Sequence, residues 1–319
     1  MNKFLFRESV SQVEVSFVLV NYKLGEQLTE CLQSLRAVQD EVECEFVVVD
    51  NSPPEASRLL ADSGFRNLRV VSNPQNSGYA SACNIGAGVA RAPYVWFLNP
   101  DVRYVEGMVR GMLDWMDRNP GVSLMGPRIL NLDGTRQYSA RSFPNWTLAF
   151  AHRNSLLTRV FPSNPFTSRY LRTNLNGVVT DVDWASGCCL LARKETFDAL
   201  GGFDEGYFLF FEDVDLSHRA MQLGRRCVYY PGVAFTHAIG GSRAHLPDRG
   251  VLARHFSAQR YFTRNVIRNP VLAKACSMAI SVRCFLSEAR QLLSRRERTA
   301  AVPEEPMAPS KTLTSTCVE

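Results

Sequence analysis

Three apolar segments in the first third of the chain each end in polar residues. They cover Val13–Tyr22, Glu45–Ser52 and Tyr94–Val102. Strands that are apolar throughout suit a parallel sheet covered on both faces, and the helical stretches between these segments provide the crossover connections. In open α/β sheets, ligands bind beyond the carboxyl ends of the strands. The sequence therefore predicts an α/β fold with a mostly parallel sheet and a binding site near Asn21, Tyr22, Asp50, Asn51, Asn99 and Asp101.

The segment GGFDEGYFLFFEDVDLSHRA, residues 201–220, places two adjacent acids after a run of apolar and aromatic residues. Carboxylates in such a setting are costly unless they have a partner or a function. If Phe208–Phe211 enter the core and Asp213 opens a helix, Glu212 and Asp213 lie at the rim of a pocket, where a general base can be tuned. An isolated pair of acids is more often a solvated helix N-cap. The polar strand ends are what favour the catalytic interpretation.

Five motifs, in order, resemble those of the family 2 glycosyltransferases, whose GT-A fold has a Rossmann-like sheet flanked by helices. They are NYKLGEQLTECLQSL, VVVDNS, NPQNSGYASACNIG, FLNPDV and GGFDEGYFLFFEDVDLSHRA, and the resemblance covers roughly Val13–Arg264. Within the family they are most similar to bacterial dTDP-rhamnosyltransferases of polysaccharide and O-antigen (lipopolysaccharide) assembly. The resemblance implies inverting transfer of one sugar, with dTDP-L-rhamnose as the expected donor and a lipid-linked or growing glycan as acceptor. The alternatives are a galactofuranosyl- or hexosyltransferase that uses a UDP-sugar, and a non-catalytic nucleotide-sugar-binding protein.

The resemblance assigns the donor nucleotide to the strand ends and the loop that follows them. Asp50 would accept hydrogen bonds from ring N–H or ribose hydroxyl groups, although an Asx-turn before Pro53 also explains it. Small residues in Asn76–Gly78 would let backbone N–H groups approach the nucleotide. The remaining expected donor contacts are Asn21, Tyr22, Asn99 and Arg243, the last as a donor to phosphate.

Asn99, Pro100 and Asp101 occupy the place of the family's metal-binding DxD motif, with Asn instead of the first Asp. Asp101 is therefore the one certain anionic ligand, and Mg²⁺ or Mn²⁺ suits one carboxylate with diphosphate oxygens and water. A Pro-Asp turn without metal explains the same residues. The resemblance makes His237, after the predicted strand Cys227–Phe235, a second ligand or a diphosphate contact, whereas a lone His is more often structural.

On the acceptor side, Asp213 matches the family's catalytic base, which takes the proton from the attacking hydroxyl. Glu212 is expected to orient the acceptor or the base, and Asp215 to face away or cap the helix. Trp184, which precedes small residues including Gly187, would stack on the apolar face of a sugar. A core position explains Trp184 almost as well.

Composition supports one catalytic domain with an extension. A chain of 319 residues with 45% hydrophobic content can bury a full α/β core. The net charge of +5 suits anionic nucleotide sugars or lipid head groups and is too small to indicate nucleic acid. Nine cysteines without a CxxC pattern favour reduced thiols in the cytoplasm. We predict a catalytic domain over 13–245, a helical extension over 246–300 and a disordered tail over 301–319. Within the catalytic domain, 13–102 would bind the donor and 103–245 the acceptor. The residues that select the acceptor are expected in 141–182.

The extension contains one long predicted helix, Val271–Arg298, with apolar residues gathered on one side. The pattern fits a helix packed on its own domain and equally a helix on an anionic membrane surface, which the arginines near its end slightly favour. No signal peptide and no run of eighteen uninterrupted apolar residues is present. We therefore expect a cytoplasmic protein that contacts the inner membrane peripherally and has no spanning segment. The side in question carries Leu272, Ala275, Met278, Ala279, Val282, Phe285, Leu286 and Leu293, and the arginines are Arg290, Arg295, Arg296 and Arg298.

Overall fold

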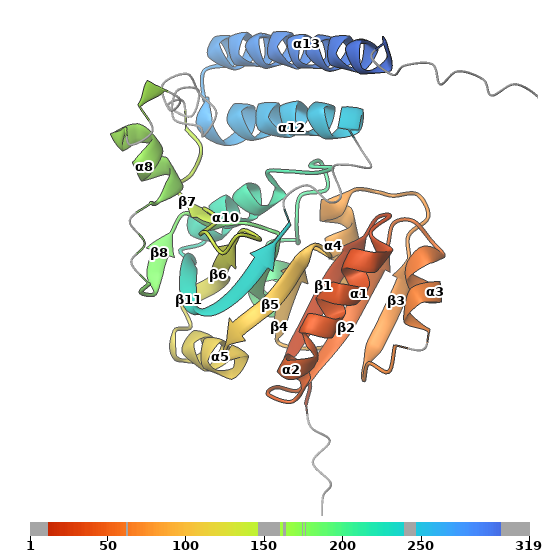
Figure 1. Ribbon diagram of the computed structural model, residues 1–319. Coiled ribbons are helices and arrows are strands. Elements are labelled where there is room, and N and C mark those ends of the chain that lie inside the picture. Colours follow the sequence, from red (N-terminus) through yellow and green to blue (C-terminus); the bar gives the residue numbers. More distant parts are fainter. Residues whose placement is uncertain are drawn as a thin grey trace, which may run out of the picture.

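The computed structural model describes residues 12–61, 63–145, 160–161, 164–173, 175, 177–238 and 247–300. Within them the chain forms a nine-stranded sheet with the order β3-β2-β1-β4-β10-β6-β11-β5, and β8 pairs with β11 (Figure 1). The strands are β1 Val15–Asn21, β2 Cys44–Asp50, β3 Leu68–Ser72, β4 Tyr94–Leu98, β5 Val102–Gly107, β6 Val122–Leu130, β8 Thr180–Val182, β10 Cys189–Arg193 and β11 Arg226–His237.

The first four strands are parallel, which confirms the predicted α/β fold. β1 pairs in parallel with β2 and β4, and β2 pairs in parallel with β3. Every residue of β1 and β2 is buried, as expected for strands covered on both faces. β10 then runs antiparallel to β4, so that Cys189 at its start is the partner of Leu98 at the end of β4. This reversal brings residues 187–188 to the same edge as the strand ends.

Helices cover both faces of the sheet, and the alternation of side chains along β1 divides the core in two. Phe17 and Leu19 pack on one face, whereas Val18 and Val20 pack on the other. The first face is covered by α1 (Gly25–Ser34), α2 (Arg36–Gln39), α3 (Glu55–Leu60) and α5 (Val109–Arg118), and the second by α4 (Tyr79–Val89), α9 (Lys194–Ala199) and α10 (Glu212–Gln222). A short ladder of β7 (Ala140–Arg141) and β9 (Trp184–Ala185), with α8 (Pro165–Leu171), lies beside the sheet.

Helices α12 (Pro247–Tyr261) and α13 (Pro270–Ala300) lie side by side at one end of the molecule, joined through a π-helical turn at Phe262–Val266 (Figure 1). Arg260 and Arg264 tie α12 and this turn to Asp204, at 2.8 and 2.6 Å. The predicted helix Val271–Arg298 is confirmed, with slightly wider bounds. The predicted tail over 301–319 lies outside the described residues.

One helix in the described part of the chain is long and apolar enough to cross a membrane, judged by length and composition alone. Its window is Pro270–Ser287, with a mean hydropathy of 1.3. The prediction that no segment spans a membrane used a different criterion. It depended on an uninterrupted apolar run, which Lys274 and Arg283 break.

Candidate active site

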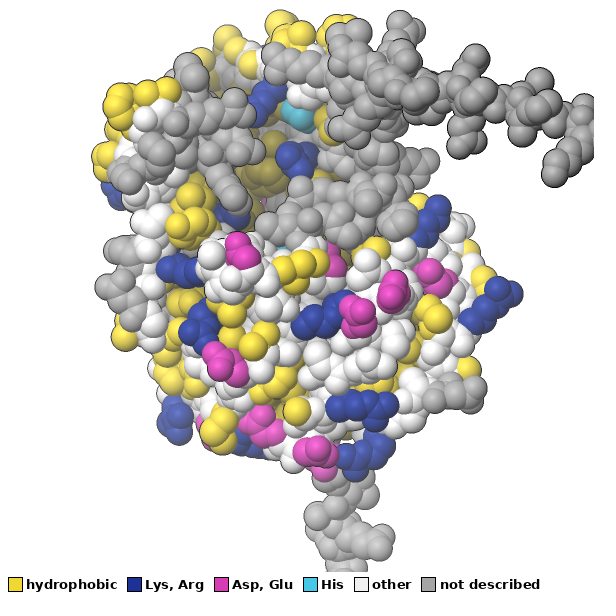
Figure 2. Space-filling view, in the orientation of Figure 1, with side chains coloured by type: hydrophobic (Ala, Val, Ile, Leu, Met, Phe, Trp, Pro, Cys, Tyr) yellow, Lys and Arg dark blue, Asp and Glu magenta, His cyan; other side chains and the backbone are white. Residues whose placement is uncertain are grey.

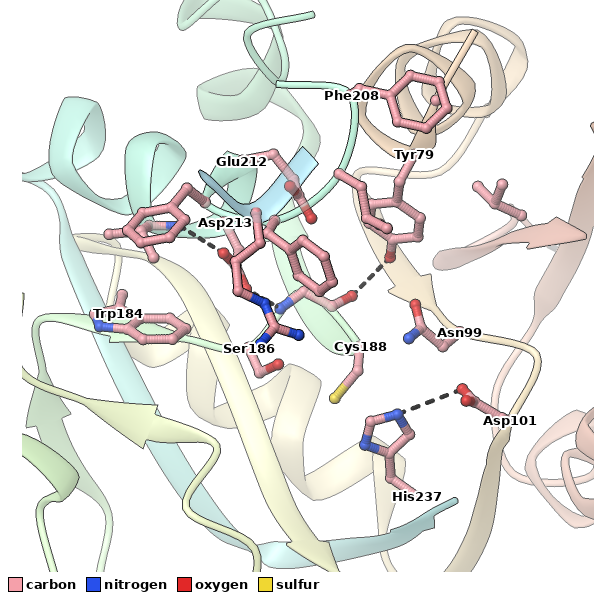
Figure 3. A pocket seen from close by; sticks show the side chains of 18 of the residues that line it. Tyr79, Asn99, Asp101, Trp184, Ser186, Cys188, Phe208, Glu212, Asp213 and His237 are labelled. Carbon is pink, nitrogen blue, oxygen red and sulfur yellow. Dashed lines mark hydrogen bonds and ion pairs between the residues drawn. The ribbon is translucent and has the colours of Figure 1, made fainter. Parts of the chain in front are cut away.

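A cavity of about 380 Å³ opens where the strand ends meet (Figure 3). Asp213 and Trp184 lie on one side of it, and Asp101 and His237 on the other. The structure thus brings together residues from the first and the last strands of the sheet. Of the predicted site residues, the cavity is lined by Tyr22, Asn76, Gly78, Asn99, Asp101, Trp184, Gly187, Glu212, Asp213 and His237.

Three predicted residues do not line the cavity within the described structure. Arg243 lies outside the described residues. Asn21 and Asp50 are fully buried at the ends of β1 and β2, where the Asn21 amide donates to Asp50 Oδ1 at 3.1 Å. The backbone N–H groups of Ser52 and Ala56 also donate to the Asp50 carboxylate, at 3.1 and 2.8 Å. In this arrangement Asp50 holds the turn after β2, which matches the Asx-turn interpretation.

That turn presents Asn51 to the cavity in place of Asp50. The Asn51 amide donates to Asn76 Oδ1 at 3.1 Å, and Asn73 donates to Asn51 Oδ1 at 2.6 Å. Sequence reasoning placed Asn51 among the strand-end polar residues but did not carry it into the donor site. The signal was present, because side chains of successive residues in an extended chain point in opposite directions.

Gly78 joins the donor side of the cavity to the aromatic segment on the other side. It has a φ of +93°, and a Cβ atom there would lie 2.5 Å from the carbonyl oxygen of Phe208. The next residue, Tyr79, donates its backbone N–H to that same oxygen at 2.8 Å. Only glycine allows this approach, so the Asn76–Gly78 loop fixes the segment that precedes the two acids.

The predicted burial of Phe208–Phe211 in the core is wrong. These residues are half-buried and line the cavity. Phe210 and Phe211 both have positive φ, at 69° and 68°, so the chain turns sharply and α10 begins at Glu212 instead of Asp213. Two consecutive non-glycine residues in this region are uncommon and costly, and such strain clusters at functional sites.

Asp213 is buried at the start of α10 with its carboxylate held by backbone groups. Gly187 N–H donates to Oδ2 at 2.7 Å, and Val214 N–H donates to Oδ1 at 2.8 Å. Burial raises the pKa of Asp213, while these two donors and the positive charge of Arg141 pull it down again. Gly187 suits this contact, because a Cβ atom there would lie 3.3 Å from Asp213 Cβ.

Glu212 is also buried, but its carboxyl group is less well supported. Its Oε2 has no hydrogen-bond partner in the described structure. Burial, and then the neighbouring charge of Asp213, raise the pKa of Glu212 well above its usual range. The two acids are therefore supported differently: Asp213 accepts two backbone hydrogen bonds that favour its ionised form, whereas burial and the neighbouring acid favour the protonated form of Glu212.

Arg141 is a cavity residue that the sequence did not reveal. Its guanidinium lies over the Trp184 ring at 5.2 Å, and its Nε donates to the carbonyl of Tyr138 at 2.6 Å. The guanidinium of Arg141 therefore covers one face of the Trp184 ring. The Trp184 indole N–H donates separately to the carbonyl of Ser142 at 2.8 Å. Arg141 is the last residue of β7, which gave no sequence signal because it is two residues long. It supplies a positive charge beside the proposed base.

Asp101 and His237 face each other on the opposite side of the cavity. The distance from His237 Nε2 to Asp101 Oδ1 is 3.4 Å, and that oxygen is buried with no hydrogen bond in the described structure. The other ring nitrogen, Nδ1, lies 2.9 Å from Gln137 Oε1, and the Gln137 amide donates to the His237 carbonyl at 3.1 Å. Gln137 thereby fixes the ring so that Nε2 points at Asp101. Although burial lowers it, Cys188 and Asp101 together raise the pKa of His237 to about 10.

The residues around Asp101 fit part of a divalent metal site. Asn99, Asp101 and His237 offer oxygen and nitrogen donors to one region of the cavity, and Asp101 Oδ1, which makes no hydrogen bond in the described structure, has His237 as its neighbour at 3.4 Å. In the described part of the chain, no group of three or more His, Cys, Asp or Glu side chains is placed to hold a metal. A metal here would need oxygens from the substrate, as Mg²⁺ commonly does. Binding would also displace the proton from His237.

Asp215 is structural. It is buried, forms an ion pair with Arg219 at 2.7 Å, and accepts from the Tyr207 hydroxyl at 3.3 Å. It neither faces solvent nor lines the cavity. The remaining cavity residues that sequence reasoning missed include Tyr79, Tyr170 and Arg254, drawn from three separate segments. Ser186, expected beside Trp184 in the wall of the sugar pocket, also lines the cavity.

Comparison with known proteins identifies the family of this chain. The sequence model of "Glycosyl transferase family 2" matches residues 16–195. The chain is 34% identical over 251 residues to an N-acetylglucosaminyl-diphospho-decaprenol L-rhamnosyltransferase of Mycobacterium tuberculosis, covering 75% of this chain and 81% of that protein. It is 40% identical over 93 residues to the rhamnosyltransferase WbbL of Escherichia coli, covering 28% and 33%. The crystal structure of GalNAc-T7 with UDP, GalNAc and Mn²⁺ has a TM-score of 0.52 at 14% identity, covering 89% of this chain and 58% of that one.

Proposed function

The chain belongs to glycosyl transferase family 2, and on this basis we propose that it transfers L-rhamnose from dTDP-L-rhamnose to a lipid-linked or growing glycan, one sugar per encounter and with inversion. The similarity to the mycobacterial L-rhamnosyltransferase, which extends over three quarters of this chain, carries the proposal. Its name describes a diphospho-decaprenol-linked acceptor. That similarity supports a rhamnosyl donor and an acceptor of the same chemical kind.

Asp213 is the general base in this proposal. An acceptor hydroxyl in the space between Trp184 and Asp213 loses its proton to the carboxylate as its oxygen attacks the anomeric carbon. The bond from that carbon to the nucleoside diphosphate breaks on the opposite face, so the configuration inverts. The N–H groups of Gly187 and Val214 keep the carboxylate in place, and Glu212, which also lines the cavity, orients the acceptor.

The donor nucleotide lies along the other wall. Tyr22, Asn51 and the Asn76–Gly78 loop offer an aromatic ring, amide groups and a glycine where backbone can come close. Asp50 then supports the nucleotide site indirectly, by holding the turn that carries Asn51. Arg243 remains a proposed contact to phosphate.

Asn99, Asp101 and His237 would hold the divalent ion, Mg²⁺ or Mn²⁺. When bound, such an ion stabilises the negative charge that develops on the departing diphosphate. The buried Asp101 oxygen that makes no hydrogen bond in the described structure, and the orientation of His237 by Gln137, support this assignment. A lipid-linked acceptor stays in its bilayer, so we propose a cytoplasmic enzyme with peripheral contact to the inner membrane.

A donor panel tests the proposal. Purified protein is melted with dTDP-L-rhamnose and with UDP-sugars, each with and without Mg²⁺, because a ligand at about 100 times its Kd adds about 2.7 kcal/mol to stability. We expect dTDP-L-rhamnose with Mg²⁺ to give the largest shift, and rhamnose to appear in a lipid-linked acceptor. A larger shift with a UDP-hexose would favour the hexosyltransferase alternative. Donor binding without transfer to any acceptor would favour the non-catalytic one.

A further inference from the structure

Helix α13 turns an apolar face away from the protein. Over Pro270–Ser287 only 6% of the residues are buried. Figure 2 shows hydrophobic side chains gathered at the end of the molecule where α13 lies. Large apolar side chains are normally placed against a partner, and a continuous exposed set of them marks an interaction surface. The exposed set is Val271, Leu272, Met278, Val282, Phe285 and Leu286, each between 51% and 73% exposed.

The positions of these residues define one continuous face. At about 100° per residue they fall within an arc of roughly 140° around the helix. Lys274 and Arg283, both exposed, stand at the two margins of this arc. Cys284, on the opposite side, is buried toward α12. An apolar arc bordered by basic side chains is the pattern of a helix that lies in the plane of a membrane interface, where long basic side chains reach the phosphates.

The charge of the surrounding segment favours an anionic partner. Residues 249–287 include seven Lys and Arg and no Asp or Glu. Arg260 and Arg264 are paired with Asp204, whereas Lys274 and Arg283 lie exposed beside the apolar face. Pairing of this face with a second copy would bring like charges together. An anionic lipid surface would neutralise them.

We propose that α13 docks flat on an anionic phospholipid bilayer through the face formed by Val271, Leu272, Met278, Val282, Phe285 and Leu286. Spanning the bilayer would instead place Lys274 and Arg283 in the hydrocarbon and separate α13 from α12. Docking also has a consequence for the active site, which rests on the proposed function. α12 lies beside α13 and contributes Arg254 to the cavity wall, so a docked enzyme would hold its cavity near membrane-embedded acceptors.

Co-sedimentation with vesicles tests this proposal without donor or acceptor. Full-length protein is mixed with vesicles of phosphatidylcholine alone or with added phosphatidylglycerol, at low and high salt. We expect binding to the anionic vesicles that weakens with salt. The double variant Met278→Glu/Val282→Glu should bind at least about tenfold more weakly, because it removes two apolar side chains from the interface.

The matched control, Leu59→Glu/Leu223→Glu, makes the same change at two leucines that are 48% and 58% exposed and lie outside α12 and α13, and it should bind like the wild type. Equal melting temperatures for both variants show that the fold is intact. No binding to anionic vesicles by the wild type would overturn the proposal. A dimer in light scattering that only the α13 variant disrupts would assign the face to a second copy, and resistance to carbonate washing would assign it to a membrane span. Transfer to a short soluble acceptor should continue in the α13 variant, so loss of docking is distinguishable from a wrong proposed function.

Discussion

Asp50 and Asp213 both follow apolar stretches of the chain, but the structure surrounds them differently. Asp50 is fully buried at the end of β2, and its carboxylate accepts hydrogen bonds from Asn21, Ser52 and Ala56. It is not among the residues that line the cavity. Asp213 lines the cavity, beside a second acid and within the influence of Arg141. A carboxylate whose bonding capacity is used inside the fold is structural. One that is held in place yet faces a cavity can exchange a proton.

The same contrast separates the two halves of the cavity. The donor side is built from the ends of consecutive parallel strands, β1, β2 and β4. The acceptor side is built from Arg141, Gly187 and Asp213, which come from separate segments joined by hydrogen bonds and stacking. Changes on the donor side should therefore act first on binding and stability, and changes around Asp213 on the rate.

The largest effect should follow Asp213→Asn. This change keeps the shape of the side chain and removes its basicity, so we expect the rate to fall by a factor on the order of 10² to 10⁴ while donor affinity barely changes. Asp50→Asn is the matched change. It should cost about 1–3 kcal/mol of stability, because one of the donors to the carboxylate loses its acceptor, and leave the rate of folded protein close to normal. Rates and melting temperatures of the two variants check this. The distinction between the two acids fails if Asp50→Asn is the inactive one.

The next largest effect concerns Asp101 and the metal. Asp101→Ala should lower the transfer rate on the order of 10²-fold and weaken donor binding only when Mg²⁺ is present, because it removes the anionic ligand. Gln137→Ala should raise the metal concentration needed for half-maximal rate, since His237 loses the partner that orients it. Titration of both variants with Mg²⁺ is the measurement. Undiminished turnover in excess EDTA would contradict the metal assignment.

The parts of the fold and site that could be predicted have local signals. The strands around Phe17, Val48 and Phe97 are apolar runs, and the polar residues that follow mark the edge where the cavity forms. The pair Glu212–Asp213 was recognisable from its motif. Arg141 and Gln137 were not, because their roles depend on contacts with Trp184 and His237, which lie 43 and 100 residues further along the chain. The orientation of Asp50 was not predictable for a related reason: a strand-end acid does not reveal whether it faces the cavity or the turn.

A smaller effect should follow Arg141→Gln, which tests whether Arg141 supports the base. Loss of its positive charge should raise the pKa of Asp213, so the acid limb of the pH–rate profile moves to higher pH and the rate near neutrality falls about tenfold. Arg141→Lys should restore the position of the acid limb in part. The control is Arg136→Gln, since Arg136 also stacks on aromatic rings, at 5.7 Å from Tyr138 and 5.4 Å from Tyr229. An acid limb that does not move would leave Arg141 with a packing role beside Trp184.

The smallest effect concerns the pH dependence of stability in Glu212→Gln. This variant tests which of the two acids, Glu212 or Asp213, is the one that keeps a proton in the folded protein. Folding raises the pKa of Glu212 well above its ordinary value of 4.5, so over the window above 4.5 the folded protein keeps a proton that the unfolded chain has released. Stability contributed by this group is therefore complete at lower pH and is lost as pH rises, by up to about 1.4 kcal/mol per pH unit. Gln carries no proton to lose, so the melting temperature of the variant relative to wild type should increase from pH 5 to pH 8, while its transfer rate falls only severalfold. Because Asp213 and Glu212 influence each other, the difference reports the titration of the two acids as a pair. If the melting temperatures of the two proteins instead change in parallel from pH 5 to pH 8, Glu212 is already ionised in the folded protein. Glu212 is then the candidate base in place of Asp213.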